Sequence, residues 1–450
     1  MFLTQKLISI TIDGHHLDVE AGTSIYDAAA SAGIDIPTLC YHPNIDASAN
    51  CRLCVVEQVF ETENGDSTAP SARSVLASET KLLPACRSIV EPGQVVFTDS
   101  EGVRVSRRGS LRLLLSGVDL SDAPELTAML AEYDVSGDAP SVRGSLPVID
   151  DNPYYIRDYA KCVMCWRCVD VCGDQVQLTY AIEPGERGFH VKIATHEYDG
   201  IMDTTCVYCG NCVQVCPSGA LKGRKQWQLE NTGARTDEKV VQTTCSFCGI
   251  GCGLEMHVRN GEISHATSPT DHPVNQGWLC VKGRYGWDYT QSKDRLTHPL
   301  IRTGERGSGS WRRASWDEAL EMVATQLGGI RSTYGSDSLA VYASSKCTNE
   351  DNYLLQKFTR RVLGTNNIDN CTRLCHASSV AALGLTIGTG AFTNSLDEIA
   401  ENDVIYVTGS NTTETHPITA LKIKAAIRNG AKLVVADPRA IELTRWADVH

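Results

Sequence analysis

The sequence lacks any apolar stretch long enough to span a membrane, since no run of about 18 or more uncharged apolar residues occurs. The opening residues, MFLTQKLISITIDG, contain neither a basic segment followed by a long apolar one nor a twin-arginine pair, so we expect no export signal. Long basic runs are also missing and the formal net charge is −13, which argues against nucleic acid as the main partner. We therefore predict a cytoplasmic protein with no membrane span.

Cysteine is the residue that the sequence has in excess, with 19 in 450 residues. A disulfide scaffold is typical of short secreted chains, whereas a long chain with cysteines grouped by spacing favours metal clusters. The length predicts several domains. All but three of the cysteines fall into four groups.

The first group follows residues 7–20, LISITIDGHHLDVE, whose alternation around Asp13-Gly14 predicts a β-hairpin. TSIYDAAASAG then predicts a short helix. Four cysteines come next, with 10, 2 and 31 residues between them. Two irons that share sulfides take two thiolates each, so this set suits a [2Fe–2S] cluster, with zinc as the alternative. The ligands would be Cys40, Cys51, Cys54 and Cys86.

The hairpin, the helix and these cysteines together resemble the β-grasp ferredoxin module of the complex I large iron–sulfur subunit and of its formate dehydrogenase and hydrogenase relatives. The resemblance implies a β-grasp domain over residues 1–100. In those relatives the next segment carries a histidine and three cysteines for another [4Fe–4S] cluster. Residues 101–150 contain neither residue type, and RRGSLRLLLSG predicts a helix, so we interpret this segment as a helical spacer that has lost its cofactor.

Two cysteine runs, CVMCWRCVDVC and CVYCGNCVQVCP, have the C-x-x-C-x-x-C-x-x-x-C spacing of bacterial ferredoxins, in which the fourth thiolate reaches across to the other cubane. Cys216 should then complete the cluster of the first run, and Cys172 that of the second. Gly173 stands where proline is usual, and the 33-residue gap between the runs is long enough for an inserted hairpin. We predict a domain with two [4Fe–4S] clusters over residues 151–235. Its ligands would be Cys162, Cys165, Cys168, Cys172, Cys206, Cys209, Cys212 and Cys216.

The fourth group lies in TTCSFCGIGCGLEMHVRNGEI and in WLCVKGR, whose cysteine follows the last cysteine of the first segment after 27 residues. Its glycines let the backbone fold closely around a cubane, and LEMHVRNGEI predicts a hairpin. Zinc is again the alternative. We predict a small, β-rich [4Fe–4S] domain over residues 240–298, with ligands Cys245, Cys248, Cys252 and Cys280.

From Thr244 onward the sequence resembles the molybdenum or tungsten bis-pterin oxidoreductases, and among them the formate dehydrogenases. The matching segments are TTCSFCGIGCG, HPVNQGWLCVKGRYGWDY, DRLTHPLIR, WRRASWDEAL, TNEDNYLLQKFTRRVLGTNNIDNCTRLCHASSV, GSNTTETHP and VVADPR. The resemblance implies that Cys375 binds the metal through a soft thiolate and that His376 manages a proton. It also implies that Lys282 lies between the last cubane and a pterin, and that Lys346 lies near the pterin.

The other two cysteines of this region, Cys347 and Cys371, lie outside the family's metal position, and we interpret both as packing residues. Residues 338–450 alternate strand-like and helical stretches. This predicts a doubly wound α/β pattern that binds a nucleotide at the carboxyl ends of its strands, within an α/β catalytic region over residues 299–450. The whole chain is thus predicted to be multidomain, α+β followed by an incomplete α/β region. The family's guanine dinucleotide would lie at Gly409, Asn411, Asp437 and Arg439.

The resemblance implies oxidation of formate to CO2 and passage of electrons through three [4Fe–4S] clusters to the [2Fe–2S] cluster. A flavin- and iron–sulfur-containing NAD-reducing partner or a hydrogenase module would accept them. The family's catalytic region continues past RWADVH, so we expect a fragment, or one part of a split subunit that a second chain completes. The alternatives are an electron-transfer scaffold without a working metal site, like the complex I subunit, and a nitrate reductase relative.

Overall fold

The computed structural model describes residues 7–60, 80–115, 117–135, 146–195, 200–231, 238–391 and 393–450. The chain forms two compact units, one of residues 1–286 with 399–450 and the other of residues 287–398. None of the helices in the described ranges combines the length and the apolar character needed to cross a lipid bilayer.

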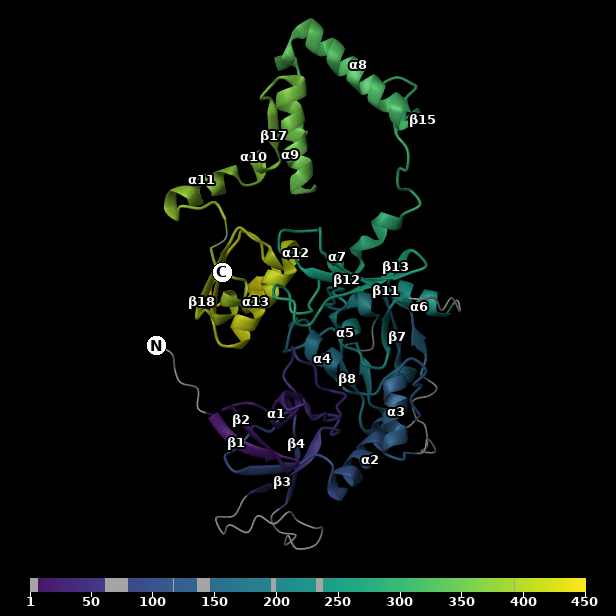
Figure 1. The fold of residues 1–450 in the computed structure, drawn as a ribbon, viewed down its shortest axis with the longest axis vertical. Helices are drawn as coiled ribbons and strands as arrows, with labels where there is room; N and C mark the ends of the chain where they lie inside the picture. Colours follow the sequence, from purple (N-terminus) through teal and green to yellow (C-terminus); the bar gives the residue numbers. More distant parts are fainter. Residues whose placement is uncertain are drawn as a thin grey trace. The chain divides into compact units, whose positions relative to one another are not determined.

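The first unit begins with a five-stranded sheet of order β2-β1-β5-β3-β4 (Figure 1). The predicted hairpin is confirmed, since β1 and β2 pair antiparallel around the turn at Asp13-Gly14. The predicted helix is α1, and it begins after Ser24, whose hydroxyl accepts a hydrogen bond from the amide of Asp27. The elements are β1 (Leu7–Ile12), β2 (His15–Glu20), α1 (Ile25–Ser31), β3 (Val55–Phe60), β4 (Lys81–Pro84) and β5 (Gln94–Phe97).

The predicted spacer contains two helices, α2 (Glu101–Leu115) and α3 (Pro124–Glu132). Residues 136–145 of the spacer lie outside the described residues. Leu111 and Leu126 share one apolar core with Cys40 and Cys51 of the first group and with Cys165 of the second. The spacer thus covers two neighbouring cysteine sets with apolar side chains.

The two ferredoxin-type runs have matching backbone conformations. The third residue of each run has a positive φ, 52° at both Met164 and Tyr208, and so does the fifth, 69° at Trp166 and 68° at Gly210. The gap between the runs contains a hairpin of β8 and β9, as expected. The elements are β6 (Val148–Ile149), β7 (Tyr155–Asp158), α4 (Arg167–Cys172), β8 (Glu183–Gly185), β9 (Lys192–Ala194), α5 (Asn211–Gln214), β10 (Leu221–Gly223) and α6 (Arg224–Asn231).

The fourth cysteine group sits around a three-stranded antiparallel sheet of order β11-β12-β13, in which the predicted hairpin turns at Asn260-Gly261. Two parallel strands near the chain end, β18 and β19, belong to the same unit, and α13 packs Ile418 and Leu421 into the core that contains Cys245 and Cys252. The elements are β11 (Glu238–Thr244), β12 (Gly253–Arg259), β13 (Glu262–Thr267), α7 (Val281–Tyr285), β18 (Val404–Thr408), α12 (Thr412–Thr415), α13 (Pro417–Arg428) and β19 (Lys432–Ala436).

The second unit continues the alternation of strands and helices with a parallel pair of its own, β16 and β17. Thr348 and Asp351 form a reciprocal capping box at the start of α9. The parallel strands of the α/β region therefore occur as two separate pairs, one in each unit. The elements are β14 (Leu300–Arg302), β15 (Trp311–Arg313), α8 (Trp316–Tyr334), β16 (Val341–Ala343), α9 (Asn349–Phe358), the π-helix η7 (Thr359–Leu363), β17 (Ile368–Asn370), α10 (Thr372–Cys375) and α11 (Ala377–Thr386).

Candidate metal centres

The four cysteines of the first group meet in the interior of the first unit, where all four are buried. The sulfur atoms of Cys54 and Cys86 are 3.1 Å apart, and the Sγ of Cys51 accepts a hydrogen bond from the amide of Leu39 at 3.4 Å. Hydrogen bonds from Cys51 and Cys86 hold the pKa of the Cys40 thiol well below its ordinary value. The loop between α1 and β3 and the turn after β4 thus bring four sulfurs to one place.

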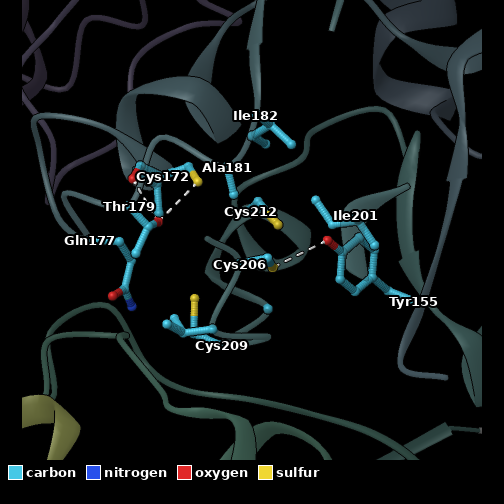
Figure 2. Close-up of a pocket in the computed structure, with 13 residues that line it drawn as sticks. Tyr155, Cys172, Gln177, Thr179, Ala181, Ile182, Ile201, Cys206, Cys209 and Cys212 are labelled. Carbon is cyan, nitrogen blue, oxygen red and sulfur yellow. Dashed lines mark hydrogen bonds between the residues drawn. The ribbon is translucent and has the colours of Figure 1, made fainter. Parts of the chain in front are cut away.

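The eight cysteines of the ferredoxin-type runs line two separate cavities. Cys216 lies with the first three cysteines of the first run, and Cys172 lies with the first three of the second. In Figure 2 the sulfur atoms of Cys172, Cys206, Cys209 and Cys212 surround one hollow. Burial raises the pKa of Cys209 to about 12, so this thiol is neutral near pH 7 until a metal displaces its proton.

Two side chains that the sequence analysis missed contact sulfurs of the second cavity. The hydroxyl of Tyr155 lies 3.8 Å from the Sγ of Cys206, and the hydroxyl of Thr179 lies 3.3 Å from the Sγ of Cys172 (Figure 2). Hydrogen bonds to cluster sulfurs are one of the determinants of iron–sulfur reduction potentials. Neither residue belongs to a cysteine motif, so spacing carries no signal for it.

The fourth group has two buried members, Cys245 and Cys252, and two half-buried ones, Cys248 and Cys280. The amide of Cys245 donates to the carbonyl of Cys252 at 2.8 Å, which closes the loop between β11 and β12. Desolvation and then the negative charge of the three neighbouring thiols raise the pKa of Cys252 to about 12. Four cysteines again form the donor set, and Cys280 is the residue that caps α7.

Lys282 lies on α7 beside a cavity of about 370 Å³. Cys209, Cys280 and Glu414 also line this cavity, and the Lys282 ammonium donates to the carbonyl of Glu414 at 3.0 Å. The lysine therefore lies next to the last cysteine of the fourth group, facing the segment that joins β18 to α13.

The four predicted nucleotide contacts lie at the carboxyl ends of β18 and β19, which are adjacent and parallel. Gly409 has a φ of +59° and its amide donates to the carbonyl of Ala436 at 3.1 Å. The buried carboxylate of Asp437 accepts hydrogen bonds from the guanidinium of Arg439 at 3.1 and 3.2 Å, and these bonds lower its pKa. Asn411 begins α12.

The second unit holds Cys375 and His376 at the junction of α10 and α11, and both side chains are exposed within it, as is Lys346. The interpretation of Cys347 and Cys371 as packing residues is wrong, because both are exposed. The thiol of Cys371 is hydrogen-bonded to the hydroxyl of Ser345 at 3.2 Å, and that of Cys347 to the carbonyl of Ser344 at 2.9 Å. These thiols are thus positioned by local hydrogen bonds and not by apolar packing.

Family models match four segments in the order that the sequence predicts. They describe a 2Fe-2S iron-sulfur cluster binding domain at residues 5–101, a 4Fe-4S dicluster domain at 161–220, a molybdopterin oxidoreductase Fe4S4 domain at 238–292 and a molybdopterin oxidoreductase at 295–450. The C-terminal part of the chain, residues 238–292 and 295–450, thus matches domains of the molybdopterin oxidoreductases. The fold class predicted from the sequence is thereby confirmed.

Relatives of the chain include the "Putative formate dehydrogenase YrhE" of Bacillus subtilis, 30% identical over 99% of this chain and 48% of that protein. The "Putative formate dehydrogenase SH0748" of Staphylococcus haemolyticus is 28% identical over 99% of this chain and 47% of that protein. The chain thus spans about half the length of these relatives. Among solved structures, the NAD+-reducing [NiFe]-hydrogenase gives a TM-score of 0.39 at 23% identity, over 48% of this chain and 87% of that one.

Proposed function

We propose that this chain belongs to a formate dehydrogenase that oxidises formate to CO2 at a molybdenum or tungsten bis-pterin centre. One observation carries the proposal: four sets of four cysteines converge inside one unit, and the last set adjoins the cavity that Lys282 lines. The donor sets fit iron–sulfur clusters, because thiolates hold both the two-iron and the four-iron types. Relatives whose names include formate dehydrogenase support formate as the substrate.

In this proposal the first cysteine group holds one [2Fe–2S] cluster and the other three groups hold one [4Fe–4S] cluster each. Cys375 would hold the molybdenum or tungsten, and Lys282, Lys346 and the strand ends after β18 and β19 would hold the pterins and their nucleotides. Bound there, the pterin metal would accept the two electrons of formate, since the cofactor supplies the redox chemistry and the protein supplies position and electrostatics.

The chain's own residues have two further roles in the proposal. His376, next to Cys375, would accept and pass on the proton that formate oxidation releases, as a general acid–base. Apolar packing by α2 and α3 covers Cys40 and Cys51 of the first group and helps to exclude water from them. Electrons leave through the first group to a flavin- and iron–sulfur-containing NAD-reducing partner or a hydrogenase module in the cytoplasm.

The test is metal analysis and activity of the complete complex, purified anaerobically from its native source. We expect about 14 iron atoms in this chain, a near-stoichiometric amount of molybdenum or tungsten, and formate-dependent reduction of a viologen dye. Nitrate reduction without formate oxidation would refute the proposal and favour a nitrate reductase.

An electron-transfer scaffold is the second candidate function, because the sixteen cysteines of the four groups are buried or half-buried, whereas Cys375 is exposed. Full iron content with neither molybdenum nor tungsten in the complete complex would favour this alternative.

A further inference from the structure

The second ferredoxin-type run and the fourth cysteine group meet at an unusually close contact. Gly210, between Cys209 and Asn211, has a φ of +68°, and a Cβ atom built there would lie 2.5 Å from the hydroxyl of Tyr285 and 2.8 Å from the Cγ of Arg284. Only glycine fits both the conformation and the space. The loop that carries Cys209 therefore lies directly against α7.

Arg284 extends from α7 into this contact, and only 3% of its surface is exposed. Its guanidinium donates to the carbonyl of Ala266 at 2.8 Å, to the Oδ1 of Asn211 at 3.2 Å and to the carbonyl of Cys209 at 3.5 Å. The fully buried Asn211 also accepts a hydrogen bond from the amide of Leu279, the residue before Cys280, at 3.1 Å. One cation thus links the two cysteine sets through short contacts.

The charge of Arg284 gives this contact an electrostatic role. A cluster held by four thiolates is an anion, and each added electron makes it more negative. A buried cation stabilises the reduced form more than the oxidised one, because the surrounding dielectric is low and attraction grows with the cluster's charge. Arginine keeps its proton when buried among such groups.

We propose that Arg284 is the residue that fixes the junction between the second ferredoxin cubane and the last cubane, and that it raises the reduction potentials of both. The inference rests on the part of the proposed function in which these cysteine sets hold cubanes. It does not depend on formate as the substrate or on a working molybdenum or tungsten site.

A matched control exists at the other end of the same unit. Arg107 of α2 is also 3% exposed and also donates to backbone carbonyls of a cysteine loop, those of Leu53 and Val55, at 2.8 and 2.9 Å. These carbonyls flank Cys54 of the first group. A substitution at Arg107 therefore also removes a buried arginine and its hydrogen bonds to backbone carbonyls, but beside a different cluster.

The experiment is a redox titration of the complete complex followed by electron paramagnetic resonance, on Arg284→Gln, Arg284→Lys and Arg107→Gln variants with wild-type iron content. We expect Arg284→Gln to shift both cubane midpoints to more negative potentials, and Arg284→Lys to restore most of the shift because it keeps the charge. Arg107→Gln should leave these two midpoints unchanged. In the fully reduced wild-type protein, the two cubanes should also show a mutual spin–spin interaction, a measurement that needs no variant.

Unchanged midpoint potentials in an iron-replete Arg284→Gln protein would overturn the inference. So would a shift in Arg284→Lys as large as the shift in Arg284→Gln. If Arg284→Gln fails to fold, absence of the spin–spin interaction in the wild type would overturn it. Loss of formate oxidation with these midpoint shifts present would refute only the proposed substrate, and low iron in the wild type would instead refute the proposed clusters.

Discussion

At the scale of single residues, a substitution of Cys375 distinguishes loss of the reaction at the molybdenum or tungsten centre from loss of the iron–sulfur clusters. We expect Cys375→Ser in the complete complex to abolish formate-dependent dye reduction, because serine offers a harder ligand to a soft metal site, while the iron content stays unchanged. The viologen assay measures the loss of activity, and metal analysis measures the iron content. Cys371→Ser, four residues earlier and also exposed, is the matched control and should retain activity.

The exchange of ligands between the two ferredoxin-type runs predicts which cluster each cysteine supports. Cys172→Ser should impair the cubane of the second run, although Cys172 belongs to the first run in sequence, because it lines the cavity of Cys206, Cys209 and Cys212. Cys216→Ser should impair the other cubane. Iron analysis and electron paramagnetic resonance of each variant distinguish the two signals, and loss of the same signal in both variants would contradict the assignment.

Cysteine groups could be predicted from the sequence because a cluster imposes short, regular spacings on the ligands in one loop. The contacts of Tyr155 with Cys206 and of Arg284 with Cys209 could not, since 51 and 75 residues separate the partners and their pairing depends on tertiary packing. The interpretation of Cys371 as a packing residue failed for a related reason: exposure follows from the fold around a residue, not from its position in a motif.

In the sheet of β11, β12 and β13, two stacked histidines predict that the stability of the sheet falls at acid pH. The rings of His257 and His265 stack at 3.9 Å between centroids, and burial, then the charge of His257, lowers the pKa of His265 to about 3 from an ordinary value of 6.5. Between these values the unfolded state binds more protons at this site, so the sheet should lose about 1.4 kcal/mol of stability per pH unit below pH 6.5.

Hydrogen exchange of the β12 and β13 amides, corrected for intrinsic rates, would measure this slope. His265→Asn should flatten the slope, whereas His298→Asn, at an exposed histidine, should leave it unchanged. An equal slope in wild type and His265→Asn would contradict the prediction.

The α2 helix offers a second test at this scale, because one face is apolar and buried. Leu111 is fully buried against Cys40 and Cys51, whereas Leu113 on the same helix is 68% exposed. Leu111→Ala should destabilise the region by about 2–5 kcal/mol and Leu113→Ala by far less. Chemical denaturation followed through the [2Fe–2S] absorption measures the difference, and equal midpoints would contradict the burial of this face.

Across the whole molecule, the cysteine sets of the clusters belong to the first unit, while residues 287–398 contain none of those sixteen cysteines. Removal of iron by a chelator under reducing conditions should therefore speed hydrogen exchange around Cys40–Cys54 and Cys245–Cys252 but leave α8 unchanged. Mass spectrometry of peptides from both units checks this outcome, and equal acceleration of α8 would contradict it.

The order of the domains could be predicted from the sequence, because each domain has a local motif. The grouping of residues 399–450 with the cysteine-rich modules could not. That grouping depends on contacts such as Lys424 with the carbonyl of Gln177 at 2.6 Å, which join segments 247 residues apart. No periodicity or spacing carries such information.

The equal φ values at Met164 and Tyr208, and at Trp166 and Gly210, show that the ferredoxin module is built from two copies of one loop. The same chain path thus holds three cysteines in each loop. The first copy keeps a large tryptophan at its fifth position, while the second carries glycine because Arg284 and Tyr285 occupy that space. The two loops therefore differ in side-chain size at the position where the second loop meets α7.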